Sequence, residues 1–380
     1  MKNIFIIGSR GYHYNYGGWE TFVSNLVDNY HDKYTNFYIS EYTNKNTLSE
    51  YKPTDNITIN PIYVKSNFKG KMFIYSVKAF KYYIDYIEKN KIENCCVYIL
   101  GLKLFSYLKI YRKKLKALNI KIIVNPDGLE WMRSKWSYPI KKFFLISESL
   151  MLNNCDLIIC DGLGIKKYID EKYSKLKDIT KYIAYGTNHI DFTNIDEEKI
   201  LKKYKLSKDK YLLMVGRCVP ENNYELVIKE FMNSNIDKKL VIITNLSSSN
   251  YYNELKNKLH FNTDSRILFI DGVYDKNELA AIRKNAYLYI HGHSVGGTNP
   301  SLLEAMSLTD LNILYDVCFN HDIGLETCLY FKDVGSLTKL LDNAKLLDIK
   351  KKELAPKAKV RIEKNFTWDI IVNEYKKIFK

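Results

Sequence analysis

A glycine-rich segment in the second half of the chain combines residue types that suit anion binding. Residues 291–306 read HGHSVGGTNPSLLEAM and follow an apolar run, AYLYI. Glycine lets a backbone approach a ligand closely, Thr298 or Asn299 can cap a helix, and Pro300 suits its first turn. A helix N-terminus at the carboxyl end of a buried strand offers N–H groups to a phosphate. The segment therefore predicts a phosphate site made by Gly296, Gly297, Thr298, Asn299, Ser301 and Leu302.

Glu304 lies one turn inside the predicted helix, where its carboxylate can accept hydrogen bonds from hydroxyl groups. The alternative is a surface glutamate on a well-capped helix. His293 stands in the loop beside the glycines, and we place it near the leaving group of any phosphate ester bound there.

A second segment, MVGRCVPENN at residues 214–223, places Arg217 directly after another apolar run. A guanidinium at a strand end can hold a pyrophosphate through paired hydrogen bonds. The alternative is an arginine that closes a salt bridge. The segment predicts a second cationic part of the same site.

The first half contributes candidates of two kinds. Gly8, Gly11, Gly17 and Gly18 lie between the first apolar run and a helix predicted to begin near Trp19. This spacing is not a dinucleotide fingerprint, so no nicotinamide cofactor is predicted. Glu20, in the first helical turn, is either a ligand contact or a charge that the helix dipole stabilises.

The segment VNPDGLEWMRSKW, residues 124–136, places Asp127 and Glu130 just beyond a buried run. A carboxylate at that edge of a sheet can accept or steady a hydroxyl proton. The alternative for Asp127 is a turn residue before Gly128. Arg133, Trp131 and Trp136 either line the same site or, for the tryptophans, belong to the core.

Short apolar runs that alternate with helical stretches must position these residues. The predicted strands are residues 3–8, 37–42, 60–64, 96–100, 121–125, 157–160, 211–216, 239–244, 267–271, 286–291, 312–316 and 328–331. Continuous apolarity indicates parallel sheets that are covered on both faces. The fold class is therefore α/β, with two Rossmann-like domains facing each other across a central cleft.

Composition sets further bounds. The chain has 380 residues with a formal net charge of +15, which indicates an anionic partner. Its seven cysteines show no zinc spacing and are predicted to be free thiols in a reducing compartment. The sequence has no signal peptide and no apolar run long enough to span a membrane, so any membrane contact is expected to be peripheral.

Basic residues concentrate between Lys65 and Lys121, where 14 Lys or Arg face only three acids, Asp85, Glu88 and Glu93. Aromatic and aliphatic residues interleave with them, as on helices that bind an anionic membrane surface. A solvated lysine face is the alternative. Nucleic acid is not predicted as a partner, because no basic-aromatic motif of a known reader is present.

The two segments of the second half resemble the donor-binding part of retaining GT-B glycosyltransferases of family 4. That family has a Gly-Arg strand end with a lysine five residues on, and two glutamates eight residues apart. This sequence has Asn222 at the lysine position and Gly296 at the first glutamate position, and only Glu304 matches. The closing stretch FTWDIIVNEYKKIF is similar to the last helix of the family.

Together, GSRGYHYNYGGWETFV, VNPDGLEWMRSKW, PENN and GHSVGGTNPSLLEAM resemble a branch of bacterial rhamnosyltransferases that assemble capsule and cell-wall polysaccharide. The resemblance implies an acceptor-binding domain at residues 1–187, a domain at 188–366 that binds a nucleotide sugar, and a helix at 367–380 that returns to the first domain. The loop YHYNYGGW departs from the branch, which more often has a Pro-Ala-x-Tyr-Gly-Gly-Phe type loop.

The resemblance further implies transfer of a sugar, with dTDP-L-rhamnose as donor and a polyprenyl-diphosphate-linked saccharide as acceptor. The enzyme is expected in the cytoplasm, peripheral on the inner face of the cell membrane, and independent of any metal or cofactor. The implied catalytic residues are Asp127, Arg217 and Glu304, the donor site includes Asn222 and His293, and the acceptor site comprises Gly17, Gly18, Glu20, Asp127 and Glu130. The alternatives are a UDP- or GDP-linked donor, or an epimerase on the same fold.

Overall fold

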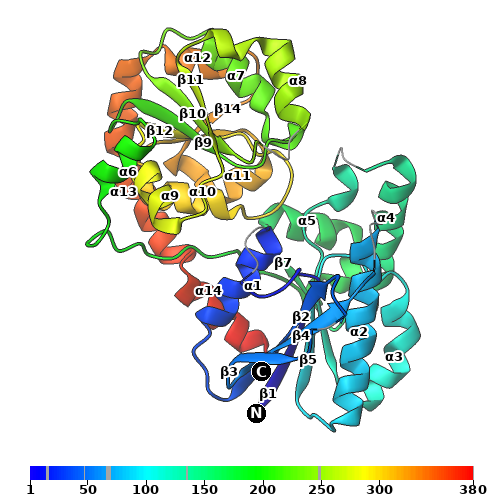
Figure 1. Ribbon diagram of the computed structural model, residues 1–380. Coiled ribbons are helices and arrows are strands. Elements are labelled where there is room, and N and C mark those ends of the chain that lie inside the picture. Colours follow the sequence, from blue (N-terminus) through cyan, green and yellow to red (C-terminus); the bar gives the residue numbers. More distant parts are fainter. Residues whose placement is uncertain (14–16, 47, 66–69, 134–135, 247–249, 380) are drawn as a thin grey trace. The chain divides into compact units, whose positions relative to one another are not determined.

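The computed structural model describes residues 1–13, 17–46, 48–65, 70–133, 136–246 and 250–379. Tyr14–Tyr16, Ser134, Lys135 and Lys69, which belong to the motifs and the basic region above, lie outside the described residues. The chain divides into two compact units (Figure 1). The first unit is Met1–Tyr185 with Trp368–Lys380, and the second is Gly186–Thr367.

The first unit is built on an eight-stranded sheet in the order β3-β4-β2-β1-β5-β6-β7-β8, which is parallel except for the β3–β4 pair. Its strands are β1 (Lys2–Ile7), β2 (Thr35–Thr43), β3 (Tyr51–Thr54), β4 (Ile57–Tyr63), β5 (Cys95–Leu100), β6 (Lys121–Asn125), β7 (Leu157–Cys160) and β8 (Thr180–Tyr182). The central strands β1 and β5 are almost wholly buried, as their continuous apolarity requires.

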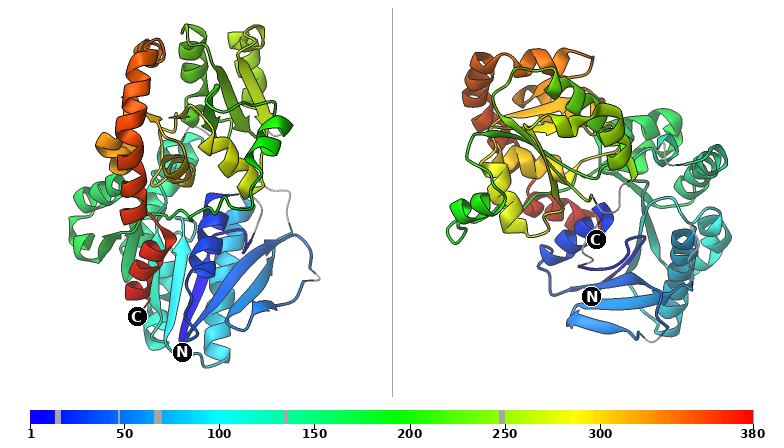
Figure 2. Two further views of the ribbon diagram at one scale, coloured as in Figure 1. Left: turned by 90° about the vertical axis from the view of Figure 1, so that its left-hand side faces the viewer. Right: turned by 45° about the horizontal axis from the view of Figure 1, so that its top comes forward.

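Helices cover both faces of this sheet. They are α1 (Gly18–Asp28), α2 (Lys71–Lys89), α3 (Tyr107–Ala117), α4 (Tyr138–Leu152), α5 (Leu163–Lys172) and α14 (Trp368–Ile378). Helices α2, α3 and α4 lie side by side, since Phe80 packs edge-to-face against Tyr111 and Phe73 against Phe143, with ring centroids 5.4 and 5.1 Å apart. The N-terminal strand and α14 both belong to this unit, and α14 packs beside α1 (Figure 2).

The second unit has an all-parallel six-stranded sheet in the order β11-β10-β9-β12-β13-β14. Its strands are β9 (Tyr211–Val215), β10 (Lys239–Thr244), β11 (Ile267–Asp271), β12 (Leu288–His291), β13 (Asn312–Tyr315) and β14 (Leu329–Phe331). Its helices are α6 (Glu197–Lys203), α7 (Tyr224–Met232), α8 (Asn250–Leu259), α9 (Lys276–Lys284), α10 (Pro300–Leu308), α11 (Cys318–Gly324), α12 (Ser336–Leu341) and α13 (Ala344–Asn365). Two apolar clusters, one on each face, bury the sheet.

Short 3-10 helices complete the chain at Glu130–Met132, Ser174–Ile179, Pro220–Asn222, Phe261–Thr263 and Leu325–Thr327. Within the described residues, no helix combines the length and the apolarity that a bilayer span requires. All seven cysteines are free, and only Cys318 is exposed.

The order of the strands marks where each sheet can bind a ligand. In the second unit, the chain moves outward from β9 through β10 to β11, and then from β12 through β13 to β14. The loops after β9 and β12 therefore leave in opposite directions at the carboxyl edge of the sheet, which is where open α/β sheets bind ligands. The first unit has the same reversal between β1 and β5.

All twelve strands that the sequence predicts are confirmed, with end points within a few residues. The sequence missed β3 and β8. Strand β3 is fully exposed and contains Pro53, as is typical of an edge strand, and β8 has only three residues. The first unit ends at Tyr185 rather than at residue 187, and its second part begins at Trp368 rather than at 367.

Helix α14 is tied to the first unit by Tyr375, which is fully buried and shares a hydrogen bond of 2.9 Å with the hydroxyl of Tyr98. We predict that Tyr375→Ala lowers the free energy of unfolding of this unit by about 3–5 kcal/mol, because it empties a buried ring site. All four tryptophans, Trp19, Trp131, Trp136 and Trp368, lie in the first unit, so tryptophan fluorescence in urea reports on it selectively. The exposed Lys377→Ala serves as control, and equal stabilities of the two variants would contradict the prediction.

Candidate functional site

In the second unit, Arg217 lies two residues beyond the end of β9, at the carboxyl edge of the sheet where β9 neighbours β12. Its side chain is exposed, and within the described part of the chain its guanidinium has no hydrogen bond or ion pair. A salt bridge that closes the strand end is thus absent among these residues. The guanidinium is available to an anionic ligand.

Residues 220–223 are hydrogen-bonded to the loop that follows β12. The side-chain amide of Asn223 donates to the carbonyl of Gly292 at 2.7 Å, and both the N–H and the hydroxyl of Ser294 donate to the carbonyl of Glu221 at 2.9 Å. A Cβ on Gly292 would lie 2.2 Å from the carbonyl oxygen of Asn222, so only glycine allows this approach. These contacts hold the segments PENN and GHS against each other in the folded chain.

Asn222 connects Arg217 to His293. Its amide nitrogen donates to the Arg217 carbonyl at 2.7 Å, and its amide oxygen lies 2.7 Å from Nδ1 of His293. With the amide in this orientation, Nδ1 of His293 carries the proton. A Cβ on Gly296 would lie 3.1 Å from Nε2 of His293, so the imidazole extends into the space beside that glycine.

Helix α10 begins as the sequence predicts, but its first N–H groups are already used. Asn299 caps the helix by accepting from the N–H of Ser301 at 3.0 Å, and its carbonyl accepts from the N–H groups of Leu302 and Leu303. In the described part of the chain, the N–H groups of Gly296 and Gly297 make no hydrogen bond. The glycine loop, and not the first turn of the helix, therefore offers the donors for a phosphate.

Three residues of the predicted donor site are buried or hydrogen-bonded within the second unit. Leu302 and Thr298 are buried, and the hydroxyl of Ser301 accepts from Arg283 at 3.0 Å. Their contact with a donor stays a prediction.

Glu304 projects from α10 with its side chain 40% exposed. One of its oxygens, Oε2, lies 2.6 Å from Nη1 of Arg283, a residue of α9. Sequence reasoning missed Arg283, because nothing in the run NELAAIRKN distinguishes a buried arginine from a surface one. His291, at the end of β12, is buried, and desolvation holds the pKa of its imidazole well below the usual value.

In the first unit, Glu20 is buried in α1 and accepts a hydrogen bond from the N–H of Arg10 at 2.8 Å. Gly17 has a φ of +148°, and a Cβ there would collide with the Glu20 carboxylate at 1.7 Å. By accepting the hydrogen bond from Arg10, Glu20 stabilises the loop that precedes helix α1. Gly18 has no atom within 4 Å of an added Cβ. Contacts of Gly17, Gly18 and Glu20 with an acceptor stay predictions.

Asp127 and Glu130 share one arginine. Arg133 lies 2.7 Å from Oε2 of Glu130 and 3.7 Å from Oδ2 of Asp127, and the indole N–H of Trp136 donates to the other oxygen of Glu130. Asp127 has a left-handed backbone, with φ of +66°, and its N–H donates to the side chain of Asn125. The loop after β6 thus holds a carboxylate pair against one guanidinium.

A third carboxyl, which sequence reasoning missed, follows the neighbouring strand β7. Asp161 is buried, and desolvation together with the charge of Asp127 raises its pKa to about 7. The signal was available, because Asp161 follows the apolar run LIIC as Asp127 follows KIIVN. Carboxyl ends of adjacent parallel strands meet at one edge, so a carboxyl with a raised pKa stands near Asp127.

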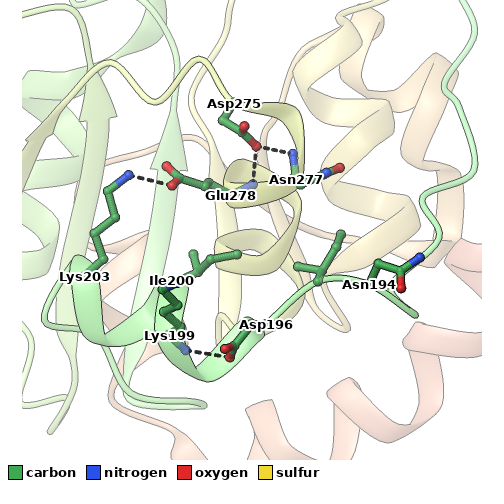
Figure 3. Close-up of a pocket in the computed structure, with 9 residues that line it drawn as sticks. Asn194, Asp196, Lys199, Ile200, Lys203, Asp275, Asn277 and Glu278 are labelled. Atoms are coloured by element: carbon green, nitrogen blue, oxygen red, sulfur yellow. Dashed lines mark hydrogen bonds and ion pairs between the residues drawn. The ribbon is translucent and has the colours of Figure 1, made fainter.

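A shallow pocket between α6 and α9 in the second unit is not part of these sites (Figure 3). Its polar groups are largely paired with one another: Lys203 with Glu278 at 2.5 Å, and Asp275 with the N–H groups of Asn277 and Glu278. We assign it no function. Over the described ranges, no group of three or more His, Cys, Asp or Glu residues is arranged to hold a metal ion.

The Asp161 environment predicts a pH dependence. A carboxyl with a pKa of about 7 in the folded state and 3.8 when unfolded binds a proton more tightly when folded. Its contribution to stability is complete below pH 4 and is lost as the pH rises to 7, a change on the order of a few kcal/mol.

We therefore expect Asp161→Asn to flatten the loss of first-unit stability between pH 4 and 8, measured by urea denaturation and tryptophan fluorescence. Asp55→Asn, an exposed change in the same unit, should keep the wild-type slope. Parallel profiles for wild type and Asp161→Asn would show that Asp161 is charged in the folded protein.

The family models that match this chain follow its division into two units. Residues 1–188 match the family model of a domain of unknown function (DUF1972), and residues 196–326 match the model of glycosyl transferases group 1. An uncharacterised glycosyltransferase of Methanocaldococcus jannaschii is 25% identical over 288 residues, which are 73% of this chain and 71% of that protein.

Solved structures share the fold of the whole chain. Sucrose-phosphate synthase from Thermosynechococcus elongatus matches with a TM-score of 0.79 at 15% identity, covering 100% of this chain and 98% of that one. Anabaena HepE, solved in complex with UDP, matches with a TM-score of 0.73 at 12% identity, covering 100% and 99%. A glycosyltransferase from Rickettsia africae has a TM-score of 0.73 at 16% identity, covering 100% and 98%.

These findings confirm the predicted fold class, with parallel sheets in two Rossmann-like units. The chain has the GT-B fold, and its second unit carries a group 1 glycosyl transferase domain at residues 196–326.

Proposed function

We propose that the second unit binds a nucleotide sugar at the carboxyl edge between β9 and β12. The observation that carries this proposal is a guanidinium and two glycine N–H groups without partners among the described residues, together with a partly exposed carboxylate, at one reversal of strand order. Cationic and N–H donors suit a diphosphate, and a carboxylate suits sugar hydroxyls. The UDP bound to Anabaena HepE supports the same class of ligand.

In this proposal Arg217 and the N–H groups of Gly296 and Gly297 hold the diphosphate and stabilise the charge that develops on it. Glu304 accepts hydrogen bonds from hydroxyls of the donor, and His293 lies beside the phosphate that departs. The acceptor oxygen attacks the anomeric carbon, the bond from that carbon to the phosphate oxygen breaks, and the acceptor proton passes to the departing phosphate. No metal is required, since Arg217 supplies the compensating positive charge.

We propose retention of the anomeric configuration and dTDP-L-rhamnose as the donor, on the strength of the GGTNPSLLEAM and PENN motifs. The first unit takes the acceptor, a saccharide on a polyprenyl diphosphate, for capsule or cell-wall polysaccharide. Asp127 and Glu130, at the carboxyl edge of its sheet, steady the attacking hydroxyl.

Peripheral binding to the membrane follows from such an acceptor. Helix α3 exposes Lys109, Lys113 and Lys116 together with Ile110, and α4 exposes Tyr138, Lys142 and Ile146. Lysines interleaved with exposed apolar side chains suit an anionic bilayer surface. Lys114 differs from this set, because it pairs with Asp85 at 3.1 Å and Glu88 at 2.7 Å, two of the three acids in the basic region.

The first test of this proposal is a panel of nucleotide sugars, screened for binding and then for transfer to a lipid-linked monosaccharide in EDTA. We predict that dTDP-rhamnose is the best substrate and that Arg217→Lys lowers kcat/KM at least about tenfold, because an ammonium cannot reproduce the paired guanidinium bonds. Lys239→Ala, an exposed residue at the opposite end of the same sheet, should behave as wild type.

Preference for a UDP- or GDP-linked sugar would replace the donor in this proposal. Turnover of the donor without any acceptor would favour an epimerase. Loss of transfer in EDTA that Mg²⁺ or Mn²⁺ restores would refute the metal-free mechanism.

For the membrane surface, we predict that the protein sediments with anionic vesicles at low salt, binds neutral vesicles weakly, and is released at high salt. Each basic residue near such a surface contributes about 1 kcal/mol. Charge reversal of Lys109, Lys113 and Lys116 should weaken sedimentation strongly and leave nucleotide binding intact.

The control for that variant reverses Lys33, Lys45 and Lys52, three exposed lysines of the same unit outside α2, α3 and α4. Because it carries the same change in net charge, equal losses in both variants would mean that only total charge matters. Equal binding of wild type to neutral and anionic vesicles would refute the surface.

A further inference from the structure

Arg283, near the end of α9, is almost completely buried, with 3% of its surface exposed. An arginine is rarely buried to this extent unless its charge is paired. Its Nη1 lies 2.6 Å from Oε2 of Glu304, and its Nη2 donates to the hydroxyl of Ser301 at 3.0 Å. One guanidinium therefore holds two residues that stand one turn apart on α10.

The contacts continue from Ser301 to the strand that leads to Arg217. The hydroxyls of Ser301 and Tyr289 lie 3.1 Å apart, and Tyr289 donates to the carbonyl of Val215 at 3.2 Å. Val215 is the last residue of β9, two residues before Arg217. A buried chain of polar contacts thus connects the carboxylate of Glu304 to the strand end that carries Arg217.

The pairing with Glu304 is one-sided. Arg283 contacts only Oε2, and in the described part of the chain Oε1 has no hydrogen-bond partner. The Nε of Arg283 is buried without an acceptor among the described residues. A buried N–H group without an acceptor lowers the stability of the fold. Packing alone therefore does not explain an arginine at this position. The arrangement restricts the rotamers of Glu304 while it leaves one oxygen open to a ligand.

We propose that Arg283 is a positioning residue for the donor site: it fixes the carboxylate of Glu304 so that Oε1 accepts a hydrogen bond from a hydroxyl of the sugar that is transferred, not of the nucleoside. This inference rests on the proposed function. Arg283 itself does not touch the donor, because its guanidinium is buried behind Glu304 and Ser301.

A double-mutant cycle tests the proposal. The variants are Arg283→Met, Glu304→Gln and the double variant, and titration calorimetry measures their affinity for the best nucleotide sugar of the panel and for the corresponding nucleoside diphosphate. We expect each single change to weaken nucleotide-sugar binding about tenfold or more, and the double change to cost no more than the worse single one. The affinity for the nucleoside diphosphate, which keeps the pentose hydroxyls but lacks those of the transferred sugar, should change less.

Arg283→Lys keeps a positive charge near Glu304 but cannot hold Ser301 at the same time, so we expect it to recover part of the affinity. It also completes the cycle with Glu304→Gln if Arg283→Met does not fold, as judged by circular dichroism. Thr309→Val is the structural control, because the Thr309 hydroxyl donates to the backbone carbonyl of Arg283 at 2.8 Å and not to its guanidinium. It should keep wild-type affinity for the nucleotide sugar.

Additive losses in the cycle, or variants of Arg283 that are less stable but bind the nucleotide sugar as wild type, would overturn the positioning role. Equal losses for nucleotide sugar and nucleoside diphosphate would also overturn it, because Glu304 would then not read the sugar. Failure of the wild-type protein to bind any nucleotide sugar would overturn the proposed function, and the positioning role with it.

Discussion

Hydrogen bonds between residues 220–223 and residues 292–294 are the constraint on which the candidate donor site depends. Each segment follows one of two adjacent strands, and Asn223, Ser294 and the bare backbone of Gly292 bring them into direct contact. Two loops that leave a sheet in opposite directions would otherwise diverge. Because they are joined, Arg217 and the glycine loop present their donors at the same edge, as the binding of a diphosphate requires.

The candidate donor-site groups Arg217, His293 and Glu304 are supported by neighbouring polar side chains. Asn222 joins the backbone of Arg217 to the imidazole of His293, and Arg283 holds one oxygen of Glu304. Each supporting side chain is itself held by hydrogen bonds. The group that it contacts therefore has fewer alternative orientations. Such preorganisation lowers the cost of ordering the site when the donor binds.

The first unit places charges differently. Its carboxylates cluster at the ends of β6 and β7, where Arg133 balances Asp127 and Glu130 while burial favours the neutral form of Asp161. Its basic region, in contrast, places lysines on α2 and α3, where Lys114 pairs with Asp85 and Glu88 while Lys109, Lys113 and Lys116 are exposed. The unit thus separates an acidic sheet edge from a basic helical surface, an arrangement that suits an acceptor with a polar head on a lipid anchor.

The sequence by itself determined the strands, the two α/β units and the candidates at strand ends, because apolar runs, glycines and a residue that follows a run are local features. Asp127 and Arg217 are candidates by the last of these features, and Glu304 is a candidate because it lies one turn inside the predicted helix. Tertiary structure decided which polar groups already have partners or are buried. Asn299 accepts from the first N–H groups of α10, and Glu20 accepts from the N–H of Arg10. Arg283 and Asp161 are buried. Burial and pairing depend on residues far apart in the chain, such as Arg283 and Glu304 or Asp127 and Asp161, and no local pattern records which of them meet.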